Sequence, residues 1–172
     1  MADVGCFEDR VSVNVAPHAS KFYRFDAEKR VQRKVYEAEC AYLADYQEMH
    51  DAAKSGTPFP APQEGASGGM VVRNLGSRDT NYLEWRDVKV DEAGKYAVTI
   101  DYSSPDERWF DISIDGGAPR RVNVKGTDGK FMKVVMVPEL SAGIHTIRLS
   151  NGPAWMPDID RLTLDAGKGL VF

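Results

Sequence analysis

The chain has 172 residues, of which 42% are hydrophobic and 28% charged, and its formal net charge at pH 7 is -4. This length suits one domain of ordinary size with a short appendage, and the composition is that of a soluble globular protein. The acidic balance argues against nucleic acid and against an anionic membrane as partners. No apolar run approaches the roughly 20 residues that span a bilayer, and no signal segment opens the chain. If the protein is exported, its signal lies outside this sequence.

Two cysteines, Cys6 and Cys40, are too few to form a thiolate zinc site. In an oxidising compartment they could form a disulfide. Cys40 could instead be a small buried hydrophobic residue, because free cysteine is among the most buried residue types. The sequence favours this second interpretation.

The first thirty residues predict a β-hairpin. Residues 10–15 alternate polar and apolar side chains, residues 21–25 are rich in strand formers, and residues 17–20 form the turn between them. An isolated two-stranded hairpin is only marginally stable in water, so this one must dock on another body or end a larger sheet. Residues 26–34 are highly charged and are interpreted as a linker.

The segment 35–40, Val-Tyr-Glu-Ala-Glu-Cys, is interpreted as an extended strand. Side chains alternate in a strand, so Glu37 and Glu39 are expected on the same side. Two carboxylates held that close repel each other and stay ionised only beside positive charge. A hard divalent cation such as calcium satisfies this requirement. From these residues alone, a solvent-facing strand edge with two hydrated glutamates is the simpler interpretation.

Between this strand and residue 70 the sequence predicts a short helix and then a loop. Apolar residues between 41 and 53 are spaced for one or two helical turns. Residues 55–62 hold three prolines, and we expect a surface loop there because proline disrupts regular structure. The Gly-rich stretch 65–69 predicts a flexible turn whose backbone can approach another group closely. The insertion at 54–65 is expected to shape or block a nearby site.

From Met70 onward the pattern is one of short strands, with breaks at Gly, Asp, Asn and Pro about every 8–12 residues. Alternating polar and apolar residues predict that strands bury one face. The spacing predicts an all-β fold, an antiparallel β-sandwich or jelly roll. The predicted strands are Met70–Arg73, Asn81–Val88, Gly94–Tyr102, Trp109–Ile114, Arg120–Val124, Lys130–Val137, Gly143–Ser150 and Ile159–Leu164.

The same alternation predicts the environment of three side chains. Trp85 and Trp109 lie in strand patterns and are expected in the core. His145 falls on the outward phase of its strand and is expected at the surface.

Five segments, taken together and in order, resemble carbohydrate-binding modules of families 35 and 6. The match covers about residues 35–166 and implies a carbohydrate-binding β-sandwich module over residues 31–172, with an oligo- or polysaccharide as its partner. The segments are residues 36–39, 66–76, 88–96, 140–149 and 157–162, which resemble in turn the opening strand, the Gly-Gly segment, a middle strand entry, the penultimate strand and the closing strand.

This resemblance implies a structural calcium ion that joins the first and last strands. Carried over position by position, its side-chain ligands are Glu37, Glu39 and Asp160, with backbone oxygens from residues 67–69. Three carboxylates with carbonyl oxygens form an oxygen-only shell, which suits calcium better than zinc. Asp158 is the alternative to Asp160 as a ligand.

The resemblance places the sugar site in loops at one end of the sandwich. Sugar rings stack on aromatic faces, and Asn, Asp or Arg contact their hydroxyls. Asn151 matches a ligand-contacting asparagine, and Trp155 in the same loop is the best candidate for stacking, although it could instead cover the core. Phe131 stands where the family often has tryptophan, which weakens stacking there. Arg73 and Asn74 are expected to face the same cleft.

A second resemblance covers residues 1–30, which are similar to the last hairpin of the β-sandwich that follows the barrel in α-galactosidases of glycoside hydrolase family 27. It implies a terminal hairpin left from a preceding domain, and a parent enzyme that is α-galactosidase-like. The barrel itself needs about 250 residues and is absent. The resemblance implies a secreted, periplasmic or cell-surface monomer whose partners are its own catalytic domain and a galactose-containing glycan.

These observations predict a non-catalytic, calcium-stabilised carbohydrate-binding module. The alternative is a structural or interaction domain of the same enzyme without sugar binding, which the Phe131 departure and the insertion at 54–65 favour. An enzyme in its own right is not expected, because His18, His50 and His145 fall in unrelated segments. The sequence also holds no catalytic triad spacing and no phosphate-binding loop.

Overall fold

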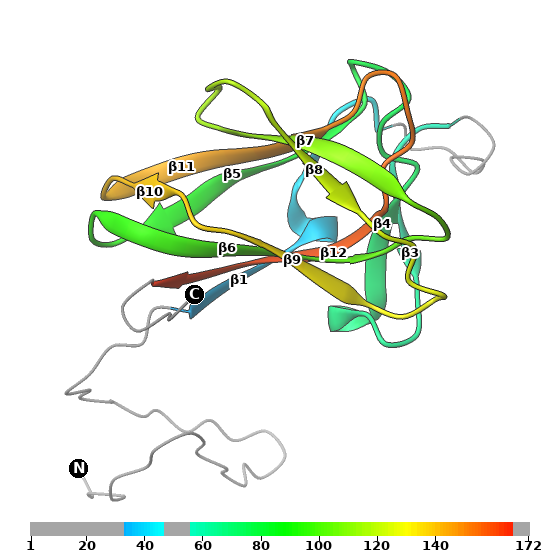
Figure 1. Ribbon diagram of the computed structural model, residues 1–172, viewed down its shortest axis with the longest axis horizontal. Helices are drawn as coiled ribbons and strands as arrows, with labels where there is room; N and C mark the ends of the chain where they lie inside the picture. Colours follow the sequence, from blue (N-terminus) through cyan, green and yellow to red (C-terminus); the bar gives the residue numbers. More distant parts are fainter. Residues whose placement is uncertain (1–32, 47–55, 167–172) are drawn as a thin grey trace, which may run out of the picture. The chain divides into compact units, whose positions relative to one another are not determined.

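The structure is a computed structural model that describes residues 33–46 and 56–166. Within these ranges the chain forms two antiparallel β-sheets that face each other, which confirms the predicted all-β sandwich of jelly-roll type (Figure 1). No helix among the described residues has the length and apolar character needed to cross a bilayer. The predicted hairpin in residues 1–30 and the position of Cys6 lie outside the described residues, so both stay predictions.

The first sheet has seven strands and is organised on the long last strand, which pairs with a neighbour on each side. Its strands, in spatial order, are β10 (Glu139–Leu140), β6 (Gly94–Ser103), β12 (Asp158–Ala166), β4 (Met70–Arg73) and β3 (Phe59–Pro62), with β1 (Arg33–Glu37) on β12 and β9 (Met132–Met136) on β6.

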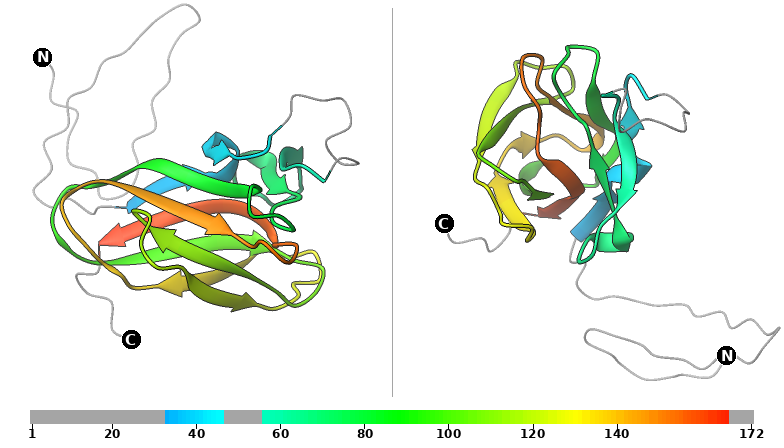
Figure 2. Two further views of the ribbon diagram at one scale, coloured as in Figure 1. Left: turned by 90° about the horizontal axis from the view of Figure 1, so that it is seen from above. Right: turned by 90° about the vertical axis from the view of Figure 1, so that its right-hand side faces the viewer.

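The second sheet has five strands and forms the opposite layer (Figure 2). In spatial order its strands are β2 (Tyr42–Leu43), β5 (Tyr82–Val90), β11 (Gly143–Ser150), β7 (Arg108–Ile114) and β8 (Arg120–Val124).

The core lies between the two layers and follows the alternation in the sequence. From the second sheet, Leu83, Phe110 and Leu149 are fully buried, and from the first sheet Ile100 and Leu162 meet them. Burying each such side chain contributes about 1.5–3 kcal/mol, so this apolar interior is the main stabilising term of the fold.

All eight strands predicted from residue 70 onward are present, with ends that agree within two residues. The structure adds the two-residue strand β10. Trp85 is 3% exposed, which confirms its expected place in the core.

The predicted single strand over 35–40 is wrong in its second half. Strand β1 ends at Glu37, and the next three residues form the 3₁₀ helix η1 (Ala38–Cys40). The backbone N–H of Ala41 closes this turn on the carbonyl oxygen of Ala38 at 3.0 Å. Ala38 is fully buried, so the turn forms where a small side chain enters the core. Glu37 and Glu39 therefore do not share one strand face.

The loop predicted over 55–62 is wrong for residues 59–62, which form the edge strand β3 paired with β4. An edge strand tolerates proline where the missing N–H would point away from its neighbour. Pro60 and Pro62 alternate with Ala61 along β3. Gln63, two residues after Ala61, directs its N–H to the same side as Ala61 and donates to Gly69 O at 3.0 Å. Both prolines therefore fall on the solvent side of the ladder.

The helix predicted over 41–53 is absent where the structure describes this stretch. Tyr42 and Leu43 form β2, which pairs with Glu84 and Leu83 of β5. Asp45, with a φ of 66°, ends the strand, and residues 47–53 lie outside the described ranges. Pairing with a distant strand outweighs the local helical spacing.

Two predicted environments are wrong because the neighbouring residue takes the expected place. His145 is 5% exposed and lies on the inward phase, whereas Ile144 is 59% exposed. Trp109 points outward and is half-buried, while Phe110 fills the core. Cys40 is exposed with a free thiol rather than buried.

Candidate functional site

The three predicted calcium ligands meet at one turn, the 3₁₀ helix η2 (Ser67–Gly69). The backbone N–H of Ser67 donates to Asp160 Oδ1 at 2.9 Å, and its hydroxyl donates to Glu37 Oε1 at 2.8 Å. A Cβ atom built on Gly68 would lie 3.2 Å from Glu39 Oε1. The end of β1, the helix η1 and the strand β12 therefore bring these carboxylates together around η2.

Glycine is required in η2 because the backbone turns there with positive φ angles of 62° at Gly68 and 81° at Gly69. A side chain at either position would be strained, and glycine alone adopts this conformation at little cost. The Gly-Gly pair thus lets the η2 backbone approach the carboxylates closely, as the sequence predicted.

The carboxylate cluster has buried oxygens without hydrogen-bond partners. Both Glu37 Oε2 and Glu39 Oε2 are buried and unpaired. Burial is the main cause that raises the pKa of Asp160 to about 6. The Ser67 N–H and the Arg161 charge lower this pKa, whereas the nearby charges of Glu37 and Asp101 raise it. A buried charged oxygen without a partner carries a desolvation penalty, and a positively charged partner would offset that penalty.

The cluster fits a hard cation by its donor chemistry. All the side-chain atoms that could bind a metal here are carboxylate or hydroxyl oxygens, and such oxygen ligands suit calcium better than zinc. Among the described residues, no three His, Cys, Asp or Glu side chains already converge on one point as a complete metal site. The two unpaired oxygens carry a burial cost that a bound cation would remove, and side-chain rotation can complete a shell around such an ion.

Asp158, the alternative ligand, lies elsewhere in the hydrogen-bond network. Its Oδ2 accepts from Arg73 Nε at 3.0 Å. Burial raises the pKa of Asp158 in spite of the Arg73 and Arg108 charges. Of the two aspartates, Asp160 is the one in contact with η2.

Trp155 is held at the loop end of the sandwich by backbone contacts. It forms an isolated bridge with Gly76, and it is 42% exposed. The N–H of Ser77 donates to Ala154 O at 2.8 Å, and the N–H of Met156 donates to Leu75 O at 2.9 Å. The loop at 151–157 is thus joined to the loop at 74–81, with the indole left partly open to solvent.

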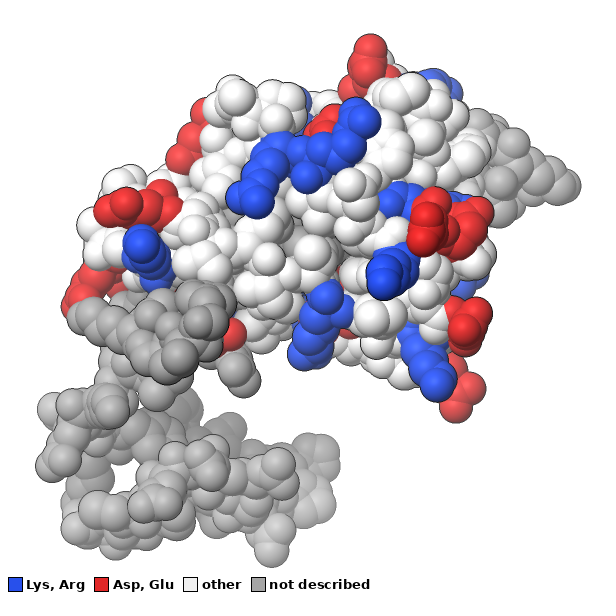
Figure 3. Space-filling view, viewed as in Figure 1, with Lys and Arg blue, Asp and Glu red and all other residues white. Residues whose placement is uncertain are grey.

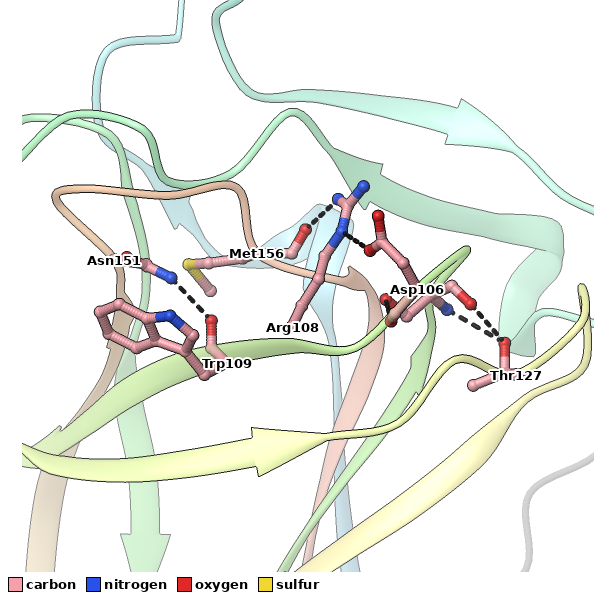
Figure 4. Close-up of polar contacts among 7 residues, drawn as sticks. Asp106, Arg108, Trp109, Thr127, Asn151 and Met156 are labelled. Atoms are coloured by element: carbon pink, nitrogen blue, oxygen red, sulfur yellow. Dashed lines mark hydrogen bonds and ion pairs between the residues drawn. The ribbon is translucent and has the colours of Figure 1, made fainter.

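Asn151 holds this loop from inside. It is 1% exposed, and its Nδ2 donates to Trp109 O at 2.8 Å (Figure 4). Its Oδ1 accepts from Ala154 N at 3.1 Å. Arg108 adds a second support, since its Nη1 donates to Met156 O at 2.7 Å. These bonds fix the Trp155 loop, and a direct sugar contact by Asn151 stays a prediction.

The other predicted sugar ligands fall into separate surroundings. Asn74 has a φ of 57°, and its carbonyl accepts from Asn81 Nδ2 at 2.7 Å beside the Trp155 loop. Arg73 points instead to the turn at 63–66, where its Nη2 donates to Gln63 Oε1 at 2.9 Å. The Phe131 ring lies 3.7 Å from a Cβ built on Gly65 in the same turn.

Sequence reasoning missed Arg78, which connects this loop to the described end of the insertion. Its Nη2 donates to Gly56 O at 2.8 Å and pairs with Asp45 at 3.1 Å, and its side chain is 45% exposed. Gly56 itself lies against the indole, since a Cβ built there would be 3.3 Å from Trp155 Cη2. The insertion therefore contacts the candidate site, and an Arg within a Gly- and Asn-rich loop was the available signal.

The family model for carbohydrate-binding module family 35 matches residues 35–167. The chain belongs to this family. The module shares its fold with a family 35 carbohydrate-binding module from Clostridium thermocellum, at 27% identity and a TM-score of 0.67, over 77% of this chain and 98% of that one. No curated protein matches this chain.

Two further structures share the fold of the module. A family 35 module from Paenibacillus barcinonensis is 18% identical, with a TM-score of 0.63, over 78% of this chain and 99% of that one. An exo-beta-1,3-galactanase from Phanerochaete chrysosporium, solved with beta-1,3-galactotriose, is 20% identical, with a TM-score of 0.63, over 77% of this chain and 29% of that one. Family 35 modules bind carbohydrate and are not catalytic, which agrees with the predicted binding function.

Proposed function

We propose that this module binds an oligo- or polysaccharide at the loop end, with the indole of Trp155 as the stacking surface. The observation that carries the proposal is the exposure of Trp155 at 42% in a loop fixed by hydrogen bonds. A large aromatic face held open to water contributes little to folding, whereas it can stack on the apolar face of a sugar ring. A fixed loop also loses little conformational freedom when the sugar binds.

Polar groups around the indole would orient the sugar. Arg78 donates to the carbonyl oxygen of Gly56, the residue that lies against the indole of Trp155. Asn81 connects Asn74 to the same place, because its Nδ2 donates to the carbonyl oxygens of both Asn74 and Gly56. The exposed part of the Arg78 guanidinium could donate to sugar hydroxyls while it keeps its contact with Gly56. The site therefore combines one aromatic face with a few polar groups, as small-ligand sites generally do.

The proposal includes a structural calcium ion held by Glu37, Glu39 and Asp160. The unpaired buried oxygens of Glu37 and Glu39 support it. Bound calcium would supply positive charge that compensates the burial of these carboxylates. Because β1, η1, η2 and β12 all meet there, the ion would stabilise the junction of the first and last strands of the module.

We further propose that the module targets a secreted or surface glycoside hydrolase of α-galactosidase type to galactose-containing glycans. The support is the resemblance of residues 1–30 to the sandwich that follows an α-galactosidase barrel. The galactanase from Phanerochaete chrysosporium and a mannanase from Podospora anserina contain a part of similar fold, and this chain covers 29% and 28% of them.

Calorimetric titration with galactose-, mannose- and uronate-containing oligosaccharides tests the sugar site. Trp155→Ala should weaken binding at least tenfold, because the stacking face is removed. Ile144→Ala is the matched control, since Ile144 is also an exposed large apolar side chain, at 59%, on another part of the surface. If no glycan binds, or if both variants bind as the parent does, the loop site is not a sugar site and the structural role becomes the better interpretation.

A further inference from the structure

The outer face of the second sheet has an unusual composition. Apart from Ile144 on β11, its outward positions hold aromatic, charged, hydroxyl or amide side chains. They are Tyr42 on β2, Tyr82, Glu84, Arg86, Asp87 and Lys89 on β5, Thr146, Arg148 and Ser150 on β11, Trp109, Asp111 and Ser113 on β7, and Arg121 and Asn123 on β8.

Three guanidinium groups lie over three aromatic rings of this face. The Cζ of Arg121 is 3.5 Å from the ring centroid of Trp109. Arg86 lies 3.4 Å above Tyr42, and Arg148 lies 4.0 Å above Tyr82. Each contact restrains a long, flexible side chain, so its N–H groups are already positioned for a ligand.

Positive charge exceeds negative charge on the face, although the chain as a whole is acidic. The three stacked arginines and Lys89 lie on the face together with three carboxylates, Glu84, Asp87 and Asp111. Glu84 is 5% exposed and is shared by Arg86 and Arg148, whereas Asp111 lies 3.4 Å from Arg121. Figure 3 shows Lys or Arg side chains gathered over β7 and β8.

The guanidinium groups remain open to solvent on their outer side. The side chains of Arg86, Arg121 and Arg148 are 50%, 57% and 42% exposed. Arginine has five donors in a planar fork, and a single carboxylate contact leaves several of them free for a further anion. The geometry matches the two oxygens of a second carboxylate.

The face extends into a groove at the β2 edge. This groove has a volume of about 550 Å³, and its lining includes Tyr36, Tyr42 and Arg86 together with the carboxylates of Glu37 and Asp87. Five strands spaced about 4.8 Å apart give a face about 19 Å across. A chain-like ligand could therefore lie across the sheet, away from the carboxylates of the groove.

We propose that this outer face is a second binding surface, separate from the Trp155 loops, for an acidic polysaccharide that carries carboxylate groups. Charge complementarity selects this occupant, because four cationic side chains, three of them guanidinium groups stacked on rings, outnumber the three carboxylates of the face. Ring carboxylates would pair with the guanidinium forks, while sugar C–H faces pack on the planes of the stacked arginines. The surface goes beyond the proposed sugar site and does not depend on it.

The test uses the full chain with polygalacturonate and with a neutral galactan, in low and in high salt. Arg121→Gln should weaken polygalacturonate binding at least fivefold and reduce its salt dependence. Arg120→Gln is the matched control, since Arg120 is on the same strand and exposed but lies on the opposite phase beside Val98 and Ile112. It should change binding less than twofold, and so should Trp155→Ala.

Three outcomes would overturn this proposal. They are no polygalacturonate binding in low salt, equal losses in Arg120→Gln and Arg121→Gln, and loss of polygalacturonate binding in Trp155→Ala. The last of these would assign the acidic glycan to the loops. Neutral galactan binding that is lost only in Trp155→Ala would support the loop site whatever the sheet face does, so the two proposals fail separately. Thermal unfolding of each variant distinguishes lost binding from lost folding.

Discussion

The indole N–H of Trp85 donates a hydrogen bond of 3.1 Å to the backbone carbonyl of Glu37. Trp85 is 3% exposed in the second sheet, and Glu37 ends the first strand of the other sheet. A core side chain thus fixes the point where the carboxylate cluster begins. The packing of the sandwich and the position of the proposed calcium ligands are therefore linked through a single bond.

Trp85→Phe should lower the free energy of unfolding by about 1–3 kcal/mol beyond the loss of apolar area, because the Glu37 carbonyl loses its donor. Urea denaturation measures this change. Trp109→Phe provides the comparison, since Trp109 is half-buried on the outer face of β7. Equal destabilisation of both variants would contradict a specific role for the Trp85 bond.

Calcium should stabilise the module, and chelation with EDTA should lower its melting temperature. Saturation at 100 times the dissociation constant corresponds to about 2.7 kcal/mol of added stability. Glu37→Gln and Glu39→Gln should remove this response, because each loses a charged oxygen that is buried and unpaired. Without calcium these variants should be at least as stable as the parent, since a neutral amide costs less to bury than a carboxylate.

Glu139→Gln is the matched control for the calcium experiment, because Glu139 is an exposed glutamate in β10. It should keep the full calcium response. A calcium-induced rise in melting temperature that persists in the Glu37 and Glu39 variants would place the ion elsewhere. No response to calcium in the parent would remove the metal from the proposal.

The strands after residue 70 could be predicted because local signals agree there. In β6, for example, Tyr96, Val98 and Ile100 alternate with more exposed neighbours, and turns with Gly or Asp separate the strands. The errors arise where a distant partner decides the structure. Strand β3 forms despite its prolines because β4 supplies the ladder, and η1 forms because Ala38 enters the core.

The candidate sites could be predicted only in part. The family resemblance pointed to Glu37, Glu39 and Asp160, and the fold brings them to η2 although they are far apart in sequence. Alternation alone could not show that the amide of Asn151 is engaged by Trp109 and Ala154. Such roles depend on how loops from different strands pack together, which a single sequence does not encode locally.

Gly76→Ala should disrupt the Trp155 loop. Gly76 has a φ of +87°, and a Cβ there would collide with the carbonyl oxygen of Ala154. Gly116→Ala is the control, because Gly116 has a φ of +69° with nothing near its Cβ. Both variants bear the cost of a positive φ, roughly 1 kcal/mol, so any further loss in Gly76→Ala measures the collision.

The Gly76→Ala variant should also bind glycan more weakly than Gly116→Ala if Trp155 forms the sugar site. Calorimetric titration and thermal unfolding of the two variants separate the effect on binding from the effect on stability. Equal stability and equal binding in both would show that the loop adapts to the added methyl group.

His145 and Asp115 predict a pH-dependent contribution to stability. His145 Nδ1 lies 2.6 Å from Asp115 Oδ2, and Nε2 lies 2.9 Å from Ser141 O. Burial alone would lower the pKa of His145, but the Ser141 carbonyl and Asp115 outweigh it and raise this pKa above 6.5. Burial likewise opposes the ionised form of Asp115, yet the Thr146 N–H and His145 hold the pKa of Asp115 below 3.8.

The directions of these shifts set the pH range in which the pair stabilises the fold. The folded state holds the His145 proton more tightly than the unfolded state, so this stabilisation is complete below about pH 6.5 and is lost as the pH rises through the folded pKa. The Asp115 contribution is complete above about pH 3.8 and is lost as the pH falls through its lowered folded pKa. Together they predict greatest stabilisation between these two values.

Urea unfolding across this pH range, for the parent and for His145→Gln, measures the contribution of the pair. The difference in unfolding free energy should be largest near pH 5 and should shrink as the pH rises through the raised pKa of His145, because the parent then loses the imidazolium charge. His50→Gln, which leaves both His145 and Asp115 in the sequence, is the control and should show no such dependence. A difference that is constant from about pH 5 to about pH 9 would mean that His145 acts through packing alone.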